Sequence, residues 1–160
     1  MIQINILYVG NIKDKFFAQA LTEYEKRLSG LCKIKNIELK VEKPPDNPSE
    51  SEIALIIRKE GDRLMENLPK KGYKIALCVE GIQLSSEDFA KKIESVTVSG
   101  DSEITFIIGG AFGMDERVKK AANFRLSISK MTFTHRMMRV ILEEQIYRAL
   151  NILSGGHYHK

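Results

Sequence analysis

The sequence predicts an α/β fold in which helices cover both faces of a mostly parallel β-sheet. Two apolar runs, at residues 73–79 and 103–108, are typical of strands that are buried on both sides. Segments with helical periodicity separate such runs, and this alternation indicates parallel strands joined by crossover helices. The chain has 160 residues, of which 43% are hydrophobic, and this is enough for one domain with its own core. We therefore expect a single domain over residues 1–160.

Each expected element follows from a local pattern. Strands are expected at residues 2–9, 32–42, 73–79 and 103–108, and helices at 14–28, from 49, at 85–98, after 113 and from about 135. The first helix carries apolar side chains at helical spacing, namely Phe17, Ala20, Leu21, Tyr24 and Leu28. Ser49 begins the second helix after the proline-rich loop 44–48, and Glu52 three residues later completes a capping-box pattern.

A glycine-rich loop follows the apolar run at 103–108. Gly109, Gly110 and Gly113 permit a sharp turn, and they let a ligand approach main-chain amides without meeting a Cβ atom. Plain turns use the same residues, so this pattern alone leaves both interpretations open.

The positions of three loops indicate where a ligand would bind. Ligands of parallel sheets bind at the carboxyl ends of the strands. Glu80–Gly81, Gly109–Gly110 and the loop after Leu126 all fall at such ends and are expected to converge. No Gly-x-Gly-x-x-Gly fingerprint follows the first strand, which disfavours a Rossmann dinucleotide site and an FMN- or NAD-dependent enzyme of flavodoxin-like fold.

Composition constrains the partners and the compartment. The formal net charge of +4, from 25 basic and 21 acidic residues, is mild and permits a nucleic-acid partner without requiring one. Cys32 and Cys78 have no Cys-x-x-Cys spacing and no partnering histidines, so we expect small core residues in a reducing compartment and no metal site. The absence of a signal peptide or a transmembrane run predicts a soluble cytoplasmic protein without a membrane partner.

The histidines are concentrated at the C-terminal end of the chain. His135 lies at the expected start of the final helix, and His157 and His159 lie beyond its end. The unperturbed pKa of histidine is the nearest to neutral among the side chains, so this concentration indicates proton transfer or phosphate contact. A hydrogen bond at a helix terminus, or a solvated tail, would explain the same residues without function.

Motifs along the whole chain resemble those of a known family. They are Ile4–Gly10, Glu23–Leu28, Ile108–Gly113, Leu126–Phe133, His135, Arg139–Val140, Glu144–Ala149 and Tyr158–Lys160. In this combination the chain closely resembles the RlmH family of SPOUT methyltransferases. The resemblance implies a single SPOUT domain over residues 1–160 with a C-terminal trefoil knot.

The resemblance also implies a reaction and its partners. It implies an S-adenosylmethionine-dependent enzyme that methylates N3 of a pseudouridine in 23S ribosomal RNA, on the assembled ribosome and as a homodimer. Free RNA as the substrate stays open. The alternative is a non-enzymatic, ribosome-associated RNA-binding protein that keeps the fold, and binding of S-adenosylmethionine discriminates between the two.

The cofactor-binding residues are carried over from the family's motifs. They are Leu77, Gly109, Ile128, Ser129, Lys130, Met131, Thr132 and Phe133. Backbone amides and carbonyls of these segments would hydrogen-bond the adenine edge, while Leu77, Ile128 and Met131 offer apolar faces to the ring. Without the family, the run 128–133 favours a short strand and turn before a helix, and Lys130 could equally be a solvated turn residue.

The chemistry requires placement of the target base and removal of one proton, from N3. His135, His159 and Tyr158 are the candidates to lie close to that base, and Tyr158 would alternatively stack on an unpaired nucleotide. Arg139 would orient RNA or stabilise developing negative charge. An exposed Arg139 that pairs with Glu143 four residues on would be a purely structural alternative.

Three positions depart from the family's pattern. Thr134 and His157 stand where proline is common, and Cys78 stands where an acidic residue commonly follows Leu77. The hydroxyl of Thr134 can still cap the final helix. The family predicts no role for His157.

The final helix has more apolar surface than one face requires. Its broad apolar face comprises Met138, Ile141, Leu142, Ile146, Ala149, Leu150 and Leu153. Val140 and Tyr147, seven residues apart, form a second stripe. We expect this stripe to pack against a second copy of the chain, so that the tail of one subunit completes the site of the other.

Overall fold

A computed structural model describes all residues from Met1 to Lys160. The elements, in order, are β1 (Gln3–Val9), α1 (Lys15–Leu28), β2 (Lys33–Leu39), α2 (Glu50–Asn67), β3 (Tyr73–Gln83), α3 (Ser86–Val98), β4 (Glu103–Ile108), α4 (Glu116–Ala121), β5 (Phe124–Ser127) and α5 (His135–Leu153). The five strands form one sheet in the order β2-β1-β4-β3-β5, and every pairing is parallel. The α/β class and the parallel sheet are thus confirmed, and the trefoil knot stays a prediction.

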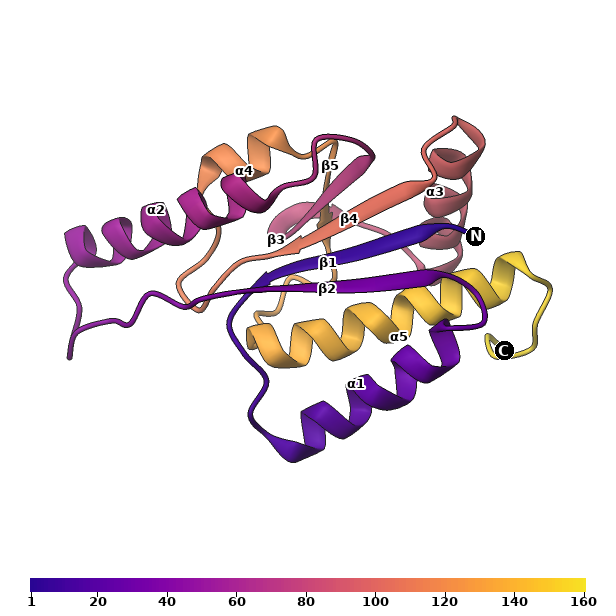
Figure 1. Cartoon of the computed structure of the whole chain (residues 1–160), viewed down its shortest axis with the longest axis horizontal. Helices are drawn as coiled ribbons and strands as arrows, with labels where there is room; N and C mark the ends of the chain where they lie inside the picture. The colour runs from indigo at the N-terminus through magenta and orange to yellow at the C-terminus, as the bar shows by residue number, and fades with distance from the viewer.

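The helices form two layers, one on each face of the sheet. Figure 1 shows α2 and α4 together above the sheet and α1 and α5 together below it. Helix α3 belongs to the same layer as α5, because its buried side chains join the same core cluster. None of the helices is both long enough and apolar enough to cross a membrane.

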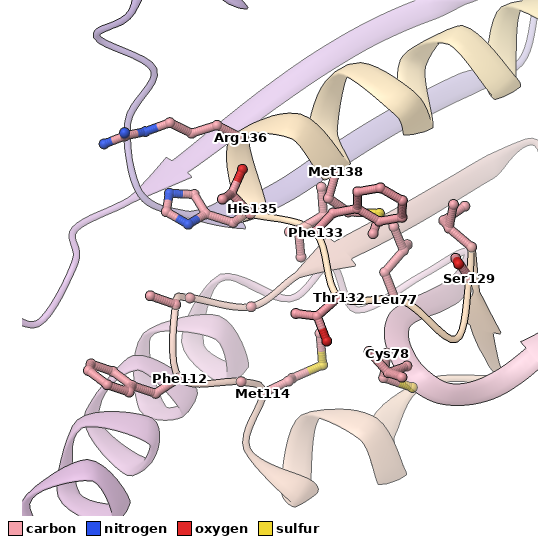
Figure 2. Close-up of a pocket in the computed structure, with 18 of the residues that line it drawn as sticks. Leu77, Cys78, Phe112, Met114, Ser129, Thr132, Phe133, His135, Arg136 and Met138 are labelled. Carbon is pink, nitrogen blue, oxygen red and sulfur yellow. The ribbon is translucent and has the colours of Figure 1, made fainter.

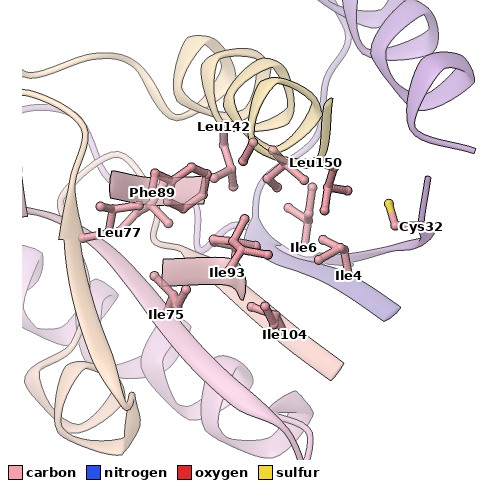
Figure 3. Packing of buried hydrophobic residues seen from close by; sticks show 14 of the residues in the cluster. Ile4, Ile6, Cys32, Ile75, Leu77, Phe89, Ile93, Ile104, Leu142 and Leu150 are labelled. Atoms are coloured by element: carbon pink, nitrogen blue, oxygen red, sulfur yellow. The ribbon is translucent and has the colours of Figure 1, made fainter. Parts of the chain in front are cut away.

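The larger core lies between the sheet and the layer of α1, α3 and α5 (Figure 3). Its 19 buried residues include Ile4 and Ile6 of β1, Phe106 of β4 and Leu142 of α5. The rings of Phe89 and Phe106 meet edge-on with centroids 6.0 Å apart, which favours α3 packed directly on β4. The apolar face predicted for the final helix supplies the core with Leu142, Ile146, Ala149 and Leu150.

The smaller core fixes α2 and α4 on the opposite face. Leu64 of α2 and Val118 of α4 are buried against Ile107 of β4 in a cluster of eight residues. A Cβ atom on Gly61 would lie 2.5 Å from the side chain of Asp115, so glycine lets α2 approach the start of α4 closely. This approach positions the loop between β4 and α4.

Local patterns predicted most element boundaries correctly. The capping box at Ser49 is confirmed, because its hydroxyl accepts the Glu52 N–H at 3.2 Å and the Glu52 carboxylate accepts the Ser49 N–H at 3.1 Å. The prediction of a strand to residue 42 is wrong, since β2 ends at Leu39 where its ladder with β1 ends.

Strand β3 is longer than predicted because it is interrupted rather than terminated. Its register with β5 shifts between Leu77 and Ile82, so the intervening residues bulge out of the ladder. Gly81 permits this, since a Cβ atom there would lie 2.7 Å from the backbone carbon of Leu126. The bulge carries Cys78, which was expected in the core, to the wall of a pocket, whereas Cys32 is buried as expected.

Candidate functional site

A pocket of about 790 Å³ lies at the carboxyl edge of β3, β4 and β5. Its walls come from the bulge of β3, the glycine loop after β4, the segment between β5 and α5, and the first turn of α5 (Figure 2). The convergence of the three loops predicted from the sequence is therefore confirmed. The volume lies within the range of pockets that bind cofactors and small ligands.

The glycine loop forms one wall and is tightly folded. A Cβ atom on Gly109 would lie 3.1 Å from the Gly113 carbonyl oxygen and from Met114 Cβ, so the loop closes on itself at Gly109. Gly113 has a φ of +113°, in the region that favours glycine, and its N–H donates to the Gly110 carbonyl at 3.1 Å. Phe112, between Gly110 and Gly113, is exposed and is one of the residues that line the pocket.

His135 lies in the pocket, at the first residue of α5. The Thr134 hydroxyl accepts the Met137 N–H at 3.3 Å, so the threonine caps the helix as predicted. The imidazole is half-buried and packs on Gly10, where a Cβ atom would lie 2.9 Å from His135 Nε2. Burial, and then the charge of Arg136, lower the pKa of His135, which keeps the ring neutral and able to accept a proton at neutral pH.

Arg136 also lines the pocket, although the sequence analysis did not single it out. Its guanidinium donates to the Asn11 carbonyl at 3.4 Å and pairs with Asp14 at 3.3 Å, which ties α5 to the loop after β1. Phe17, which belongs to the apolar face predicted for the first helix, is half-buried and lines the same pocket. Only its position directly after His135 could have indicated Arg136 from the sequence, because its contacts with Asn11 and Asp14 are remote along the chain.

Most of the predicted cofactor residues meet in this pocket. Its lining includes Leu77, Gly109, Ile128, Ser129, Thr132 and Phe133. Lys130 and Met131 are not part of the lining, and the Met131 side chain is 73% exposed. A turn explains this, because the Ser129 hydroxyl accepts the Met131 N–H at 3.0 Å and directs the two residues outward.

The β3 end of the pocket carries a charged pair that the family motifs do not include. Glu80, in the bulge, pairs with Lys119 of α4, and both residues line the pocket. The hydrogen bond from Lys119 lowers the pKa of Glu80 and keeps its carboxyl ionised. Cys78 and Ser129 lie at the same end in Figure 2, away from His135.

The predicted tail residues lie far from this pocket within one chain. Helix α5 has 19 residues, so its two ends are about 28 Å apart. The tail folds back on the C-terminal end of α5, where the Tyr158 hydroxyl donates to Glu144 at 3.2 Å and its N–H donates to Asn151 at 3.0 Å. The Tyr158 ring packs edge-on against Tyr147, with centroids 4.8 Å apart.

His159 is held between two charged side chains. Arg148 Nη1 lies 3.2 Å from Nδ1, and Glu87 Oε1 lies 2.8 Å from Nε2. The guanidinium can only donate, so Nδ1 is the acceptor and Nε2 carries the proton donated to Glu87. Both ring nitrogens of His159 are thus engaged by neighbouring side chains, whereas no hydrogen bond holds the His135 ring.

Arg139 is buried between α5, α1 and β1, outside the pocket lining. The structural alternative is right about the pair with Glu143, with Nε 3.5 Å from Oε1, but not about exposure, because tertiary packing covers this face of the helix. Arg139 also contacts Glu25 at 3.4 Å and lies over the Tyr8 ring at 4.2 Å. A role for Arg139 toward RNA stays a prediction.

The pocket residues fit the adenosyl cofactor implied by the sequence. Gly109 has no side chain to block the backbone, Leu77 and Ile128 supply apolar walls, and Ser129, Thr132 and Phe133 line the same pocket. Such walls suit a purine ring with hydrogen bonds to its edge. The fold and the pocket thus define an α/β protein with a ligand-sized pocket at the carboxyl edge of a parallel sheet.

Comparisons with known proteins identify the family. Residues 2–159 match the family model described as "Predicted SPOUT methyltransferase". The chain is 47% identical over 158 residues to the ribosomal RNA large subunit methyltransferase H of Streptococcus thermophilus, covering 99% of each chain. It is 43% identical over 157 residues to the protein of that name from Leuconostoc mesenteroides and 46% identical over 157 residues to that from Clostridium botulinum, in both cases covering 98% of this chain and 99% of the relative. The chain belongs to the SPOUT methyltransferase family.

Proposed function

We propose that the protein transfers the methyl group of S-adenosylmethionine to N3 of a pseudouridine in the large-subunit ribosomal RNA. The observation that carries this proposal is one pocket at one edge of the sheet that gathers Gly109, His135 and four residues of the segment 128–133, namely Ile128, Ser129, Thr132 and Phe133. The printed names of the relatives support ribosomal RNA as the substrate. A ribosomal substrate would place the enzyme in the cytoplasm.

The methyl donor would bind with its adenine between Leu77 and Ile128, against Gly109. When bound, the cofactor supplies an activated methyl group, so the protein need only align the target nitrogen and raise its electron density. Lys130 and Met131 would contribute main-chain atoms or cover the cofactor from outside.

His135 is the proposed general base. Its lowered pKa keeps the imidazole unprotonated at neutral pH, and the ring lies in the same pocket as the cofactor residues. The imidazole would take the N3 proton as the nitrogen attacks the methyl group. Arg136, one residue further, presents a cation at the same opening, suited to a phosphate of the RNA.

We propose that the tail acts on the pocket of a second subunit. The length of α5 separates Tyr158 and His159 from His135 within one chain, so a tail that takes part in catalysis must serve a partner. Val140 and Tyr147 are half-buried on α5 and would form part of the homodimer contact. Tyr158 would then stack on the target nucleotide.

Complementation between two inactive variants tests this arrangement. We expect His135→Ala and a Tyr158→Ala/His159→Ala double variant to be inactive alone. After subunit exchange at equal amounts, half the dimers would be mixed and each would hold one intact site, which restores about one quarter of wild-type activity. Tails that serve their own subunit would restore none, and a monomer in sedimentation at micromolar concentration would also refute the arrangement.

The proposed reaction is tested with radiolabelled S-adenosylmethionine and ribosomes that lack the modification. We expect label on one pseudouridine of the large-subunit RNA, mapped to its N3 by mass spectrometry. Comparison with protein-free RNA decides whether the assembled ribosome is required. Binding of the cofactor without labelling would refute this substrate, and absence of cofactor binding would favour a non-enzymatic RNA-binding protein.

A further inference from the structure

Glu60 of α2 is a buried carboxylate that lies behind the glycine loop. Glu60 is only 3% exposed and is not part of the pocket lining. Oε2 accepts the Glu42 N–H at 3.1 Å, whereas Oε1 is buried without any hydrogen-bond partner. A buried carboxylate oxygen without a partner is costly and therefore uncommon, so its retention requires an explanation.

The unpartnered oxygen is directed at Gly110. A Cβ atom on Gly110 would lie 2.4 Å from Glu60 Oε1, so the carboxyl rests directly against the loop backbone. Gly110 itself lines the pocket. At Gly110 the loop therefore has the pocket on one side and the Glu60 carboxyl on the other.

The second oxygen of Glu60 connects to residues that lie close to the His135 imidazole. Glu42, whose N–H it binds, is held by Arg63 at 2.6 Å. Val41, the preceding residue, lies 3.7 Å from the position of a Cβ atom on Gly10, which supports the His135 imidazole. The Glu60 carboxyl therefore contacts the glycine loop directly. Through residues 41–42 it is also connected to Gly10, on which the His135 imidazole packs.

We propose that Glu60 is a positioning residue that fixes the glycine loop for the methyl donor. The role rests on the proposed function, because it acts through the cofactor wall of that pocket. Burial raises the pKa of this carboxyl, as expected of a group enclosed by the loop. Loss of the side chain would free Gly110 and the rest of the loop to leave the conformation that accepts the cofactor.

Cofactor affinity, measured by titration calorimetry with S-adenosylmethionine, is the direct test. We expect Glu60→Ala to weaken binding about tenfold, as loss of a buried polar support would. Glu60→Asp keeps the carboxyl group but withdraws it from Gly110, so this variant should also bind more weakly than wild type. Glu60→Gln keeps the shape of the side chain and should retain most of the affinity.

Ile56→Ala is the matched control. Ile56 is buried on α2 one turn before Glu60 and is not part of the pocket lining. We expect it to lower the urea midpoint of unfolding at least as much as Glu60→Ala without changing the cofactor dissociation constant. If Ile56→Ala weakened cofactor binding as much as Glu60→Ala does, the role of Glu60 would be purely structural, and the proposal would be overturned.

A double-mutant cycle with Gly110→Ala tests the contact itself. The added methyl group collides with Glu60 Oε1, so the single variant should bind the cofactor weakly, and Glu60→Ala in the same chain should recover part of the loss. Additive losses would overturn the proposal. Failure of the wild-type protein to bind would refute the proposed function, whereas equal binding by wild type, Glu60→Ala and Glu60→Asp would refute the role of Glu60 alone.

Discussion

His135→Ala is expected to lower the turnover of methyl transfer about 10²- to 10⁴-fold, the usual contribution of a general base. The dissociation constant of S-adenosylmethionine should stay nearly unchanged, because the loss concerns a proton acceptor and not a cofactor contact. Single-turnover rates on ribosomes, together with calorimetry of cofactor binding, separate the two effects. His157→Ala is the matched control, since His157 is exposed beyond α5 and does not line the pocket.

The proposed role of His135 as a base also predicts how turnover depends on pH. A base acts in its deprotonated form, and burial lowers the pKa of His135 below its ordinary value near 6.5. Turnover of the wild-type enzyme should therefore rise with pH at acidic values and level off before neutrality. In His135→Ala that acidic inflection should vanish, and the residual rate should rise only where N3 itself begins to ionise. An unchanged inflection in the variant would assign the base elsewhere.

Patterns confined to a few consecutive residues predicted much of this fold. Ser49 and Glu52 form their capping box within one helical turn, and the Thr134 cap is equally local. The bulge in β3 was not predictable, because it depends on Gly81 lying against the backbone of β5, more than forty residues on in the printed sequence. Boundaries set by local hydrogen bonds could be predicted, and those set by a remote strand could not.

The residues of the candidate site also divide into those that local motifs predict and those that only remote packing brings in. The residues at 109 and 128–133 belong to continuous motifs, and most of them line the pocket. Arg136 and Phe17 enter the pocket only because α1 and α5 pack side by side, which no local spacing records. Glu60 was not predictable from local spacing either, because its contact with Gly110 joins α2 to a loop 50 residues further along the chain.

Arg139→Met is expected to lower the free energy of unfolding by about 3–5 kcal/mol at about pH 8.5, where Glu143 is mostly ionised; this is the usual cost of removing one partner of a buried ion pair. The variant would leave Glu143, which is 0% exposed, without its cation, and it would also remove the contact with Glu25. Urea unfolding at fixed protein concentration measures the effect. A loss below about 1 kcal/mol, the level of a surface ion pair, would contradict a structural role and favour the predicted role toward RNA.

Glu143 makes the same cluster dependent on pH. Burial, and then the charge of Glu25, raise the pKa of Glu143 to about 8, far above the ordinary value near 4.5. Because the folded state then binds this proton more tightly than the unfolded state, its contribution to stability is complete below about pH 4.5 and is lost progressively as the pH rises to 8. The slope is at most about 1.4 kcal/mol per pH unit.

Glu143→Gln is the matched variant, because its amide keeps the shape and carries no titrating proton. We expect its unfolding free energy to vary less with pH than that of the wild type between pH 5 and 8, and Arg139→Met to cost less at pH 5.5 than at pH 8.5 because Glu143 can then be neutral. An Arg139→Met/Glu143→Leu variant should recover much of the loss, since a buried pair replaced by apolar side chains is often neutral or better. A pH profile identical in wild type and Glu143→Gln would show that Glu143 is ionised throughout, with Arg139 and not burial in control of its pKa.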